Sequence, residues 1–143
     1  MEYKERELGN KVVELFEDFL QSNENDGYVD VAFSERYGFV VLVGFSEENA
    51  SFEEAYAFTN SSDLFIQLLH EYKISCLIKC QQETGLDVDY DSLSEEQKNE
   101  LHLKMDYYTS KWKKILEEST NVKSIEEVNK DYHDLVGKYA LVK

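Results

Sequence analysis

The chain has 143 residues, and its 30 Asp and Glu against 15 Lys and Arg give a formal net charge of −15 at pH 7. This excess of negative charge repels nucleic acid and anionic membranes, so we expect neither as a partner. It favours encounter with a basic protein instead, provided that the carboxylates gather on one face.

Length and composition are typical of one folded, soluble domain. Hydrophobic residues make up 42% and aromatic residues 13% of the chain, too much for a disordered one. No Gly/Ser linker or repeat divides it, so we expect a single domain over residues 1–143. The first residues lack the regions of a signal peptide, and no run approaches the roughly 20 apolar residues that span a bilayer. These features predict a cytoplasmic protein.

The first half of the chain is expected to form one helix and three strands. Residues 3–21 repeat apolar side chains at steps of three and four, as an amphipathic helix does. Residues 28–33 alternate like a half-buried strand, and the β-branched run 39–43 is typical of a central strand. Residues 51–58 fit either the start of a capped helix or an aromatic, alternating strand, and we favour the strand.

Three helices are predicted in the second half. The apolar stripe of residues 63–84 ends at Gly85, a residue suited to a helix end. Capping-box patterns at Ser94 and Ser124 then open two more amphipathic segments. We therefore expect an α+β fold in which a small three-stranded antiparallel meander packs against an N-terminal helix and three C-terminal helices.

Cys76 and Cys80 are the only cysteines, four residues apart within the predicted helix 63–84. Two cysteines cannot build a disulfide framework, and zinc would need further ligands that the sequence does not place nearby. We interpret them as small buried apolar residues, with redox sensing as the alternative.

Asp87, Asp89 and Asp91 alternate in a way that resembles a calcium-binding EF-hand loop. That loop also needs Gly at its sixth position and Glu at its twelfth, where this chain has Ser92 and Lys98. We expect no metal and no cofactor here. An acidic solvated loop before a helix start, or an acidic docking surface, accounts better for the pattern.

Recognisable catalytic motifs are missing. The three histidines lie on different predicted helices, and no HExxH, Walker A, GxSxG or dinucleotide glycine pattern occurs, so we do not expect an enzyme. Four lysines between residues 104 and 114 are interleaved with aromatic residues, but they make a weak nucleic-acid footprint on so acidic a chain. Trp112 among them is expected to be core.

These observations favour an acidic protein-binding module, of the immunity-protein or antitoxin type, that inhibits a basic toxin or nuclease. Between residues 83 and 100 there are seven carboxylates against one lysine, a local net charge of −6. The candidate partner-binding residues are Asp87, Asp89, Tyr90, Asp91, Glu95 and Glu96, with Tyr90 as an aromatic anchor. The alternative is a non-catalytic regulatory or adaptor protein whose helices dock to a partner and whose acidity only maintains solubility.

Overall fold

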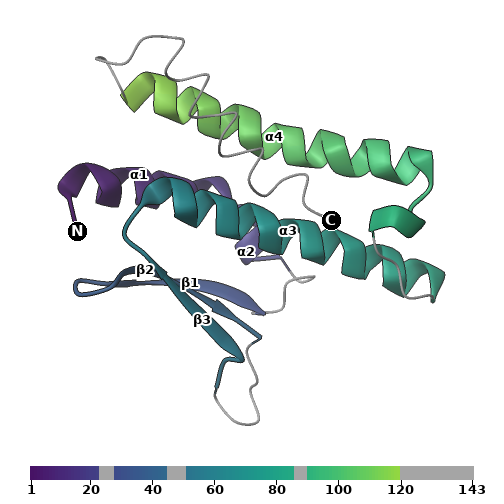
Figure 1. Ribbon diagram of the computed structural model, residues 1–143, viewed down its shortest axis with the longest axis horizontal. Coiled ribbons are helices and arrows are strands. Elements are labelled where there is room, and N and C mark those ends of the chain that lie inside the picture. The colour runs from purple at the N-terminus through teal and green to yellow at the C-terminus, as the bar shows by residue number, and fades with distance from the viewer. Residues whose placement is uncertain (23–27, 45–50, 86–89, 120–143) are drawn as a thin grey trace. The chain divides into compact units, whose positions relative to one another are not determined.

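The computed structural model describes residues 1–22, 28–44, 51–85 and 90–119 (Figure 1). In chain order its elements are α1 (Tyr3–Leu15), α2 (Glu17–Leu20), β1 (Val29–Ser34), β2 (Gly38–Val43), β3 (Glu54–Phe58), α3 (Ser61–Thr84), the 3-10 helix η1 (Tyr90–Ser92) and α4 (Glu95–Ser119). The predicted α+β fold is confirmed. The helix expected to begin near Ser124 lies outside the described residues.

The chain divides into two compact units, residues 1–68 and residues 69–143. Helix α3 begins in the first unit and continues into the second. The expectation of a single domain remains a prediction.

The sheet of the first unit is an antiparallel meander in the order β1-β2-β3. Val41 of the central strand pairs with Val31 on one side and with Tyr56 on the other, which confirms both the predicted centre and the strand expected over 51–58. Along β2, Phe39, Val41 and Val43 are buried, whereas the residues between them are half-buried. Strand β3 is exposed over nearly its whole length.

A tight turn joins β1 to β2. The Ser34 hydroxyl accepts hydrogen bonds from the backbone N–H groups of Arg36 (3.3 Å) and Tyr37 (3.2 Å). Gly38 follows with φ of +85°, a conformation that side-chain-bearing residues rarely adopt. The first residue of β2 therefore has a backbone conformation that glycine adopts most easily.

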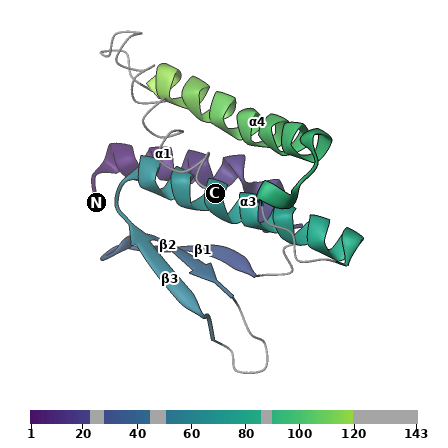
Figure 2. The ribbon, with the colours of Figure 1, turned by 45° about the vertical axis from the view of Figure 1, so that its right-hand side comes forward.

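Helices cover one face of this sheet, as Figures 1 and 2 both show for α1 and the start of α3. Gly9 of α1 lies so close to Phe39 of β2 that a Cβ on Gly9 would overlap the phenyl ring. Deeper in the unit, the rings of Phe16 and Phe65 lie 5.8 Å apart, and both side chains are completely buried. An apolar core thus forms between helices and sheet.

The N-terminal helix is interrupted, which the sequence did not predict. The expected continuous helix 3–21 is divided at Phe16, whose backbone has φ of −95° and ψ of 8°. The amide of Phe16 still donates to the Val12 carbonyl at 3.2 Å, so the chain direction is kept. Apolar spacing is the same on both sides of the break, and periodicity alone therefore cannot reveal it.

Two side-chain oxygens, one from a carboxamide and one from a carboxylate, accept hydrogen bonds from backbone amides at the start of α3. Asn60 Oδ1 accepts hydrogen bonds from the amides of Ser62 (2.9 Å) and Asp63 (3.2 Å), as an N-cap side chain does. The amide of Ser61 donates to Glu5 Oε2 of α1 at 2.7 Å. One cap therefore also ties α1 to α3 across 56 residues of sequence.

In the second unit, the remainder of α3 is followed by η1 and α4, and the two helices run in opposite directions (Figure 2). The predicted apolar stripe of α4 is buried at Leu101, Met105, Tyr108 and Trp112, which confirms Trp112 as core. The rings of Tyr72 and Tyr108 meet edge to face at 4.7 Å. Gly85, with φ of +72°, ends α3 as predicted. Within the described ranges, no helix is long and apolar enough to cross a membrane.

Candidate partner-binding site

Four of the six candidate residues lie together where η1 leads into α4. Tyr90 and Asp91 belong to η1, and Glu95 and Glu96 form the first turn of α4. We call these four residues the acidic turn. Asp87 and Asp89 lie outside the described residues.

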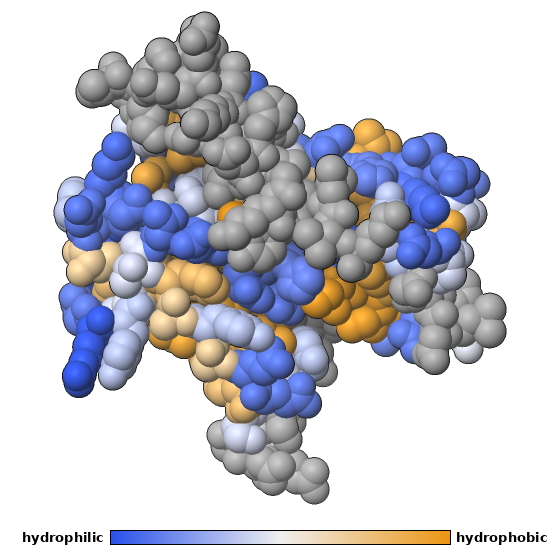
Figure 3. Space-filling view, in the orientation of Figure 1, coloured by the Kyte–Doolittle hydropathy of each residue, from blue (hydrophilic) through white to orange (hydrophobic). Residues whose placement is uncertain are grey.

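The carboxylates of the acidic turn face solvent. Asp91, Glu95 and Glu96 are all exposed, and the Glu95 side chain is 88% exposed. Lys98, the single lysine nearby in sequence, places its Nζ 3.8 Å from a Glu95 carboxylate oxygen. An exposed pair of this kind contributes little free energy and remains easy to exchange for another cation. Hydrophilic side chains also dominate this end of the surface in Figure 3.

A reciprocal capping box holds the start of α4, as the sequence predicted. The amide of Gln97 donates to Ser94 Oγ at 3.1 Å, and the amide of Ser94 donates to Gln97 Oε1 at 3.0 Å. Two backbone N–H groups at the helix start thereby gain partners. The backbone that carries Glu95 and Glu96 is consequently well defined.

Replacing Ser94 with alanine is expected to lower the free energy of unfolding by about 1 kcal/mol, because one capping bond is lost. Ser110, exposed in the middle of the same helix, is the matched control. There the change to alanine should be neutral or slightly stabilising, since alanine has the higher helix propensity. Urea denaturation of both variants measures the difference, and equal effects would show that the cap contributes nothing.

Tyr90 is packed and half-buried instead of standing free on the surface. A hydrogen bond of 2.7 Å joins its hydroxyl to Nε2 of His102 on α4. The ammonium groups of Lys73 and Lys98 lie 5.3 Å and 5.4 Å from its ring centroid, within the range of cation–π attraction. Tyr90 therefore fixes η1 to both helices of the unit, and the anchoring of a partner expected from the sequence remains a prediction.

Other exposed carboxylates lie outside the acidic turn. Glu14, Glu17 and Asp18 are exposed on α1 and α2, and Glu53 and Glu54 are exposed around the start of β3. Four further acidic residues near them in sequence, Glu24, Asp26, Glu47 and Glu48, lie outside the described residues. Negative charge therefore occurs on both units and is not confined to the acidic turn.

The two histidines in the described residues lie in different surroundings. His102 is engaged by Tyr90, and His70 is half-buried on α3. Burial lowers the pKa of His70, and the nearby positive charge of Lys73 lowers it further. Among the residues that the structure describes, no group of three or more His, Cys, Asp or Glu side chains is placed to hold a metal ion.

Sequence reasoning did not identify His102 or Lys73 as neighbours of Tyr90. Lys73 is buried with 6% exposure, although it lies on a helix whose apolar stripe does not include it. The contacts depend on how α3, η1 and α4 pack, and no spacing rule connects residues 73, 90 and 102. The one signal in the sequence was the position of Tyr90 between two predicted helices that both carry lysines.

Comparison of the chain with protein-family models, with curated proteins and with solved structures finds no match.

Proposed function

We propose that the chain is an acidic protein-binding module that inhibits a basic partner, a toxin or nuclease, as immunity proteins and antitoxins do. The observation that carries the proposal is the acidic turn, where Asp91, Glu95 and Glu96 are exposed on a capped helix start. The high net negative charge of the whole chain supports it, because such a charge attracts basic proteins over a long range.

Occupancy of a positively charged cleft is the expected mode of inhibition. A nuclease lines its active site with positive charge to hold phosphate, and carboxylates on a rigid element can take the place of that phosphate. Electrostatic steering raises association rates from about 10⁵–10⁶ to 10⁸ M⁻¹s⁻¹ or more at low salt. The capping box and the contacts of Tyr90 reduce the ordering entropy that binding would otherwise require.

The test begins with the partner. Affinity capture from the native cell, read by mass spectrometry, and expression of the adjacent reading frame both supply candidates. A candidate counts only if it is basic and loses its activity on addition of one equivalent of this chain. A captured protein that is acidic, or that stays fully active, argues against inhibition.

With that partner in hand, the triple variant Asp91→Asn, Glu95→Gln, Glu96→Gln is expected to associate about tenfold more slowly at low salt. The difference should shrink at high salt, because screening weakens steering. Stopped-flow association at several ionic strengths measures both effects.

The matched control removes the same charge elsewhere on α4, by Asp106→Asn, Glu117→Gln and Glu118→Gln, three exposed positions. It should slow association much less than the acidic-turn variant. Equal slowing by both triples would mean that only net charge matters, and the acidic turn would lose its special role.

The adaptor alternative is favoured by a different surface of α4. Leu103 is 71% exposed and Tyr107 is 57% exposed, four residues apart and hence on one side of the helix. Exposed large apolar side chains of this kind suit a docking contact. For an adaptor, alanine at these two positions would raise the dissociation rate, and association would be insensitive to salt.

A further inference from the structure

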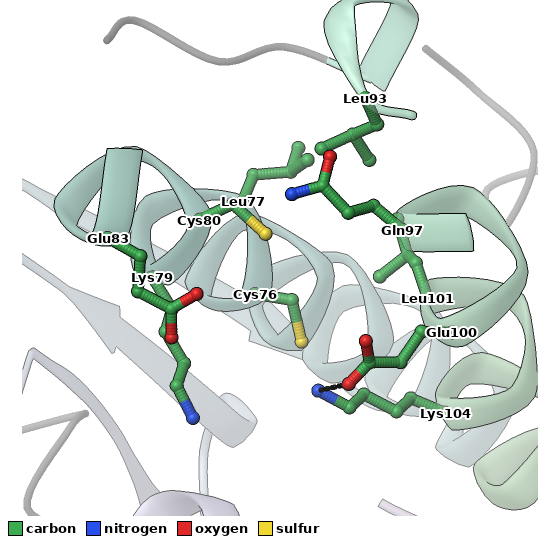
Figure 4. Close-up of a pocket in the computed structure, with 10 residues that line it drawn as sticks. All are labelled: Cys76, Leu77, Lys79, Cys80, Glu83, Leu93, Gln97, Glu100, Leu101 and Lys104. Carbon is green, nitrogen blue, oxygen red and sulfur yellow. Dashed lines mark ion pairs between the residues drawn. The ribbon is translucent and has the colours of Figure 1, made fainter. Parts of the chain in front are cut away.

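Both cysteines of the chain line one cavity of about 120 Å³ in the second unit. Cys76 and Cys80 come from α3, Leu93 closes one side, and Leu101 and Lys104 of α4 face them (Figure 4). Both cysteines are half-buried, whereas the sequence-based interpretation expected two small buried apolar residues. Two thiols that open into a shared space can act on the same ligand.

Helix geometry opposes a direct bond between the two sulfur atoms. Residues four apart on a helix have Cβ atoms about 5–6 Å apart, whereas a disulfide requires about 3.5–4.5 Å. Forming the disulfide would therefore require α3 to distort. Redox pairing, the alternative considered from the sequence, fits this arrangement poorly.

A bridging metal ion fits the same geometry better. A metal–thiolate bond is about 2.3 Å long, so two of them span up to roughly 4.6 Å, against about 2.05 Å for a disulfide. That added length allows two sulfur atoms on adjacent helical turns to meet at one ion without unwinding the helix. We propose that Cys76 and Cys80 form a two-thiolate site for a single soft metal ion of the Cu(I) class.

The donor set selects the class of ion. Thiolates are soft ligands that favour Cu(I), an ion that two ligands in line can satisfy. Structural zinc uses four protein ligands and catalytic zinc three, and the described part of the chain offers no group of three or more suitable residues. Calcium and magnesium require oxygen ligands.

The charge of the loaded site follows from the protons that binding releases. Binding exchanges two thiol protons for one Cu⁺, so two S–H bonds break, two Cu–S bonds form, two protons leave to solvent and no electron is transferred. The resulting bis-thiolate complex has a charge of −1. Two lysines, Lys79 and Lys104, and two glutamates, Glu83 and Glu100, line the cavity, so its wall is formally neutral, and the Lys104 ammonium group pairs with Glu100 at 3.4 Å.

The test uses the full reduced chain without oxygen, titrated with Cu(I) buffered by a coloured chelator. We expect the protein to withdraw one Cu(I) per chain, seen as loss of the chelator-complex absorbance. In size-exclusion chromatography the loaded chain should elute at the same volume as the metal-free chain. Cys76→Ser and Cys80→Ser should each weaken binding by about 100-fold or more, because the second thiolate binds intramolecularly.

A matched control keeps two thiols but changes their spacing. Gln82→Cys in a Cys80→Ser background places the thiols six residues apart, on different sides of the helix. This variant should bind Cu(I) as weakly as the single-serine variants. Affinity equal to that of the original chain would overturn the proposal, as would one Cu(I) shared by two chains.

X-ray absorption of the unaltered chain loaded with Cu(I) gives a readout that does not depend on how the variants fold. Two sulfur neighbours at one distance are expected. A shell that contains nitrogen or oxygen, or three sulfur atoms, would show that the ion is bound elsewhere or between chains.

Discussion

Replacing Phe65 with alanine is expected to lower the free energy of unfolding by about 3–5 kcal/mol, the largest effect of any change considered. The Phe65 side chain has 0% exposure, and its ring lies 5.8 Å from that of Phe16. The loss combines the transfer of a buried aromatic ring to water with a cavity that its rigid neighbours cannot fill. Urea denaturation, followed by far-UV circular dichroism, measures it.

Ile78→Ala on the same helix is the matched control, because Ile78 is 42% exposed. Its effect should stay near ±0.5 kcal/mol, as for surface substitutions in general. If the two variants lose similar stability, Phe65 is not part of a close-packed core.

The second large effect is expected for Gly9→Ala, which should lower the free energy of unfolding. Glycine-to-alanine exchange in a helix usually raises it. In an exposed helix, alanine in place of glycine stabilises by about 1 kcal/mol. At Gly9 the added Cβ would lie 2.6 Å from Cζ of Phe39 and closer still to another ring carbon. Overpacking of this kind destabilises by about 1–3 kcal/mol.

Two further variants separate overpacking from helix propensity. Asn10→Ala, at an exposed neighbouring position, should be neutral or stabilising. In a Phe39→Leu background, Gly9→Ala should be much less harmful, because the smaller side chain leaves room for the methyl group. If the effects of the two changes on the free energy of unfolding were additive, the methyl group at residue 9 would not clash with the Phe39 ring.

Much of the fold could be predicted from the sequence because periodicity reports local structure. Alternation in 28–33 and the β-branched run 39–43 identified β1 and the central β2, and Ser94 identified the start of α4. The break at Phe16 could not be predicted, since it changes one backbone position without changing the apolar spacing. Such features depend on tertiary packing.

The candidate site was predictable only in part for the same reason. A run of acidic residues indicates exposure, and Asp91, Glu95 and Glu96 are exposed. The half-buried state of Tyr90 depends on His102, twelve residues away on another helix. Likewise, spacing places Cys76 and Cys80 on one side of α3, but the cavity beside them exists only because α3 and α4 leave it open.

The exposure of β3 bears on self-association. A strand at the rim of a sheet presents backbone N–H and C=O groups to which a second molecule can add, a frequent route to aggregation. Glu53 and Glu54, exposed where β3 begins, place negative charge beside those groups and oppose the approach of an identical acidic molecule. The acidity of this chain thus also opposes its self-association in concentrated solution.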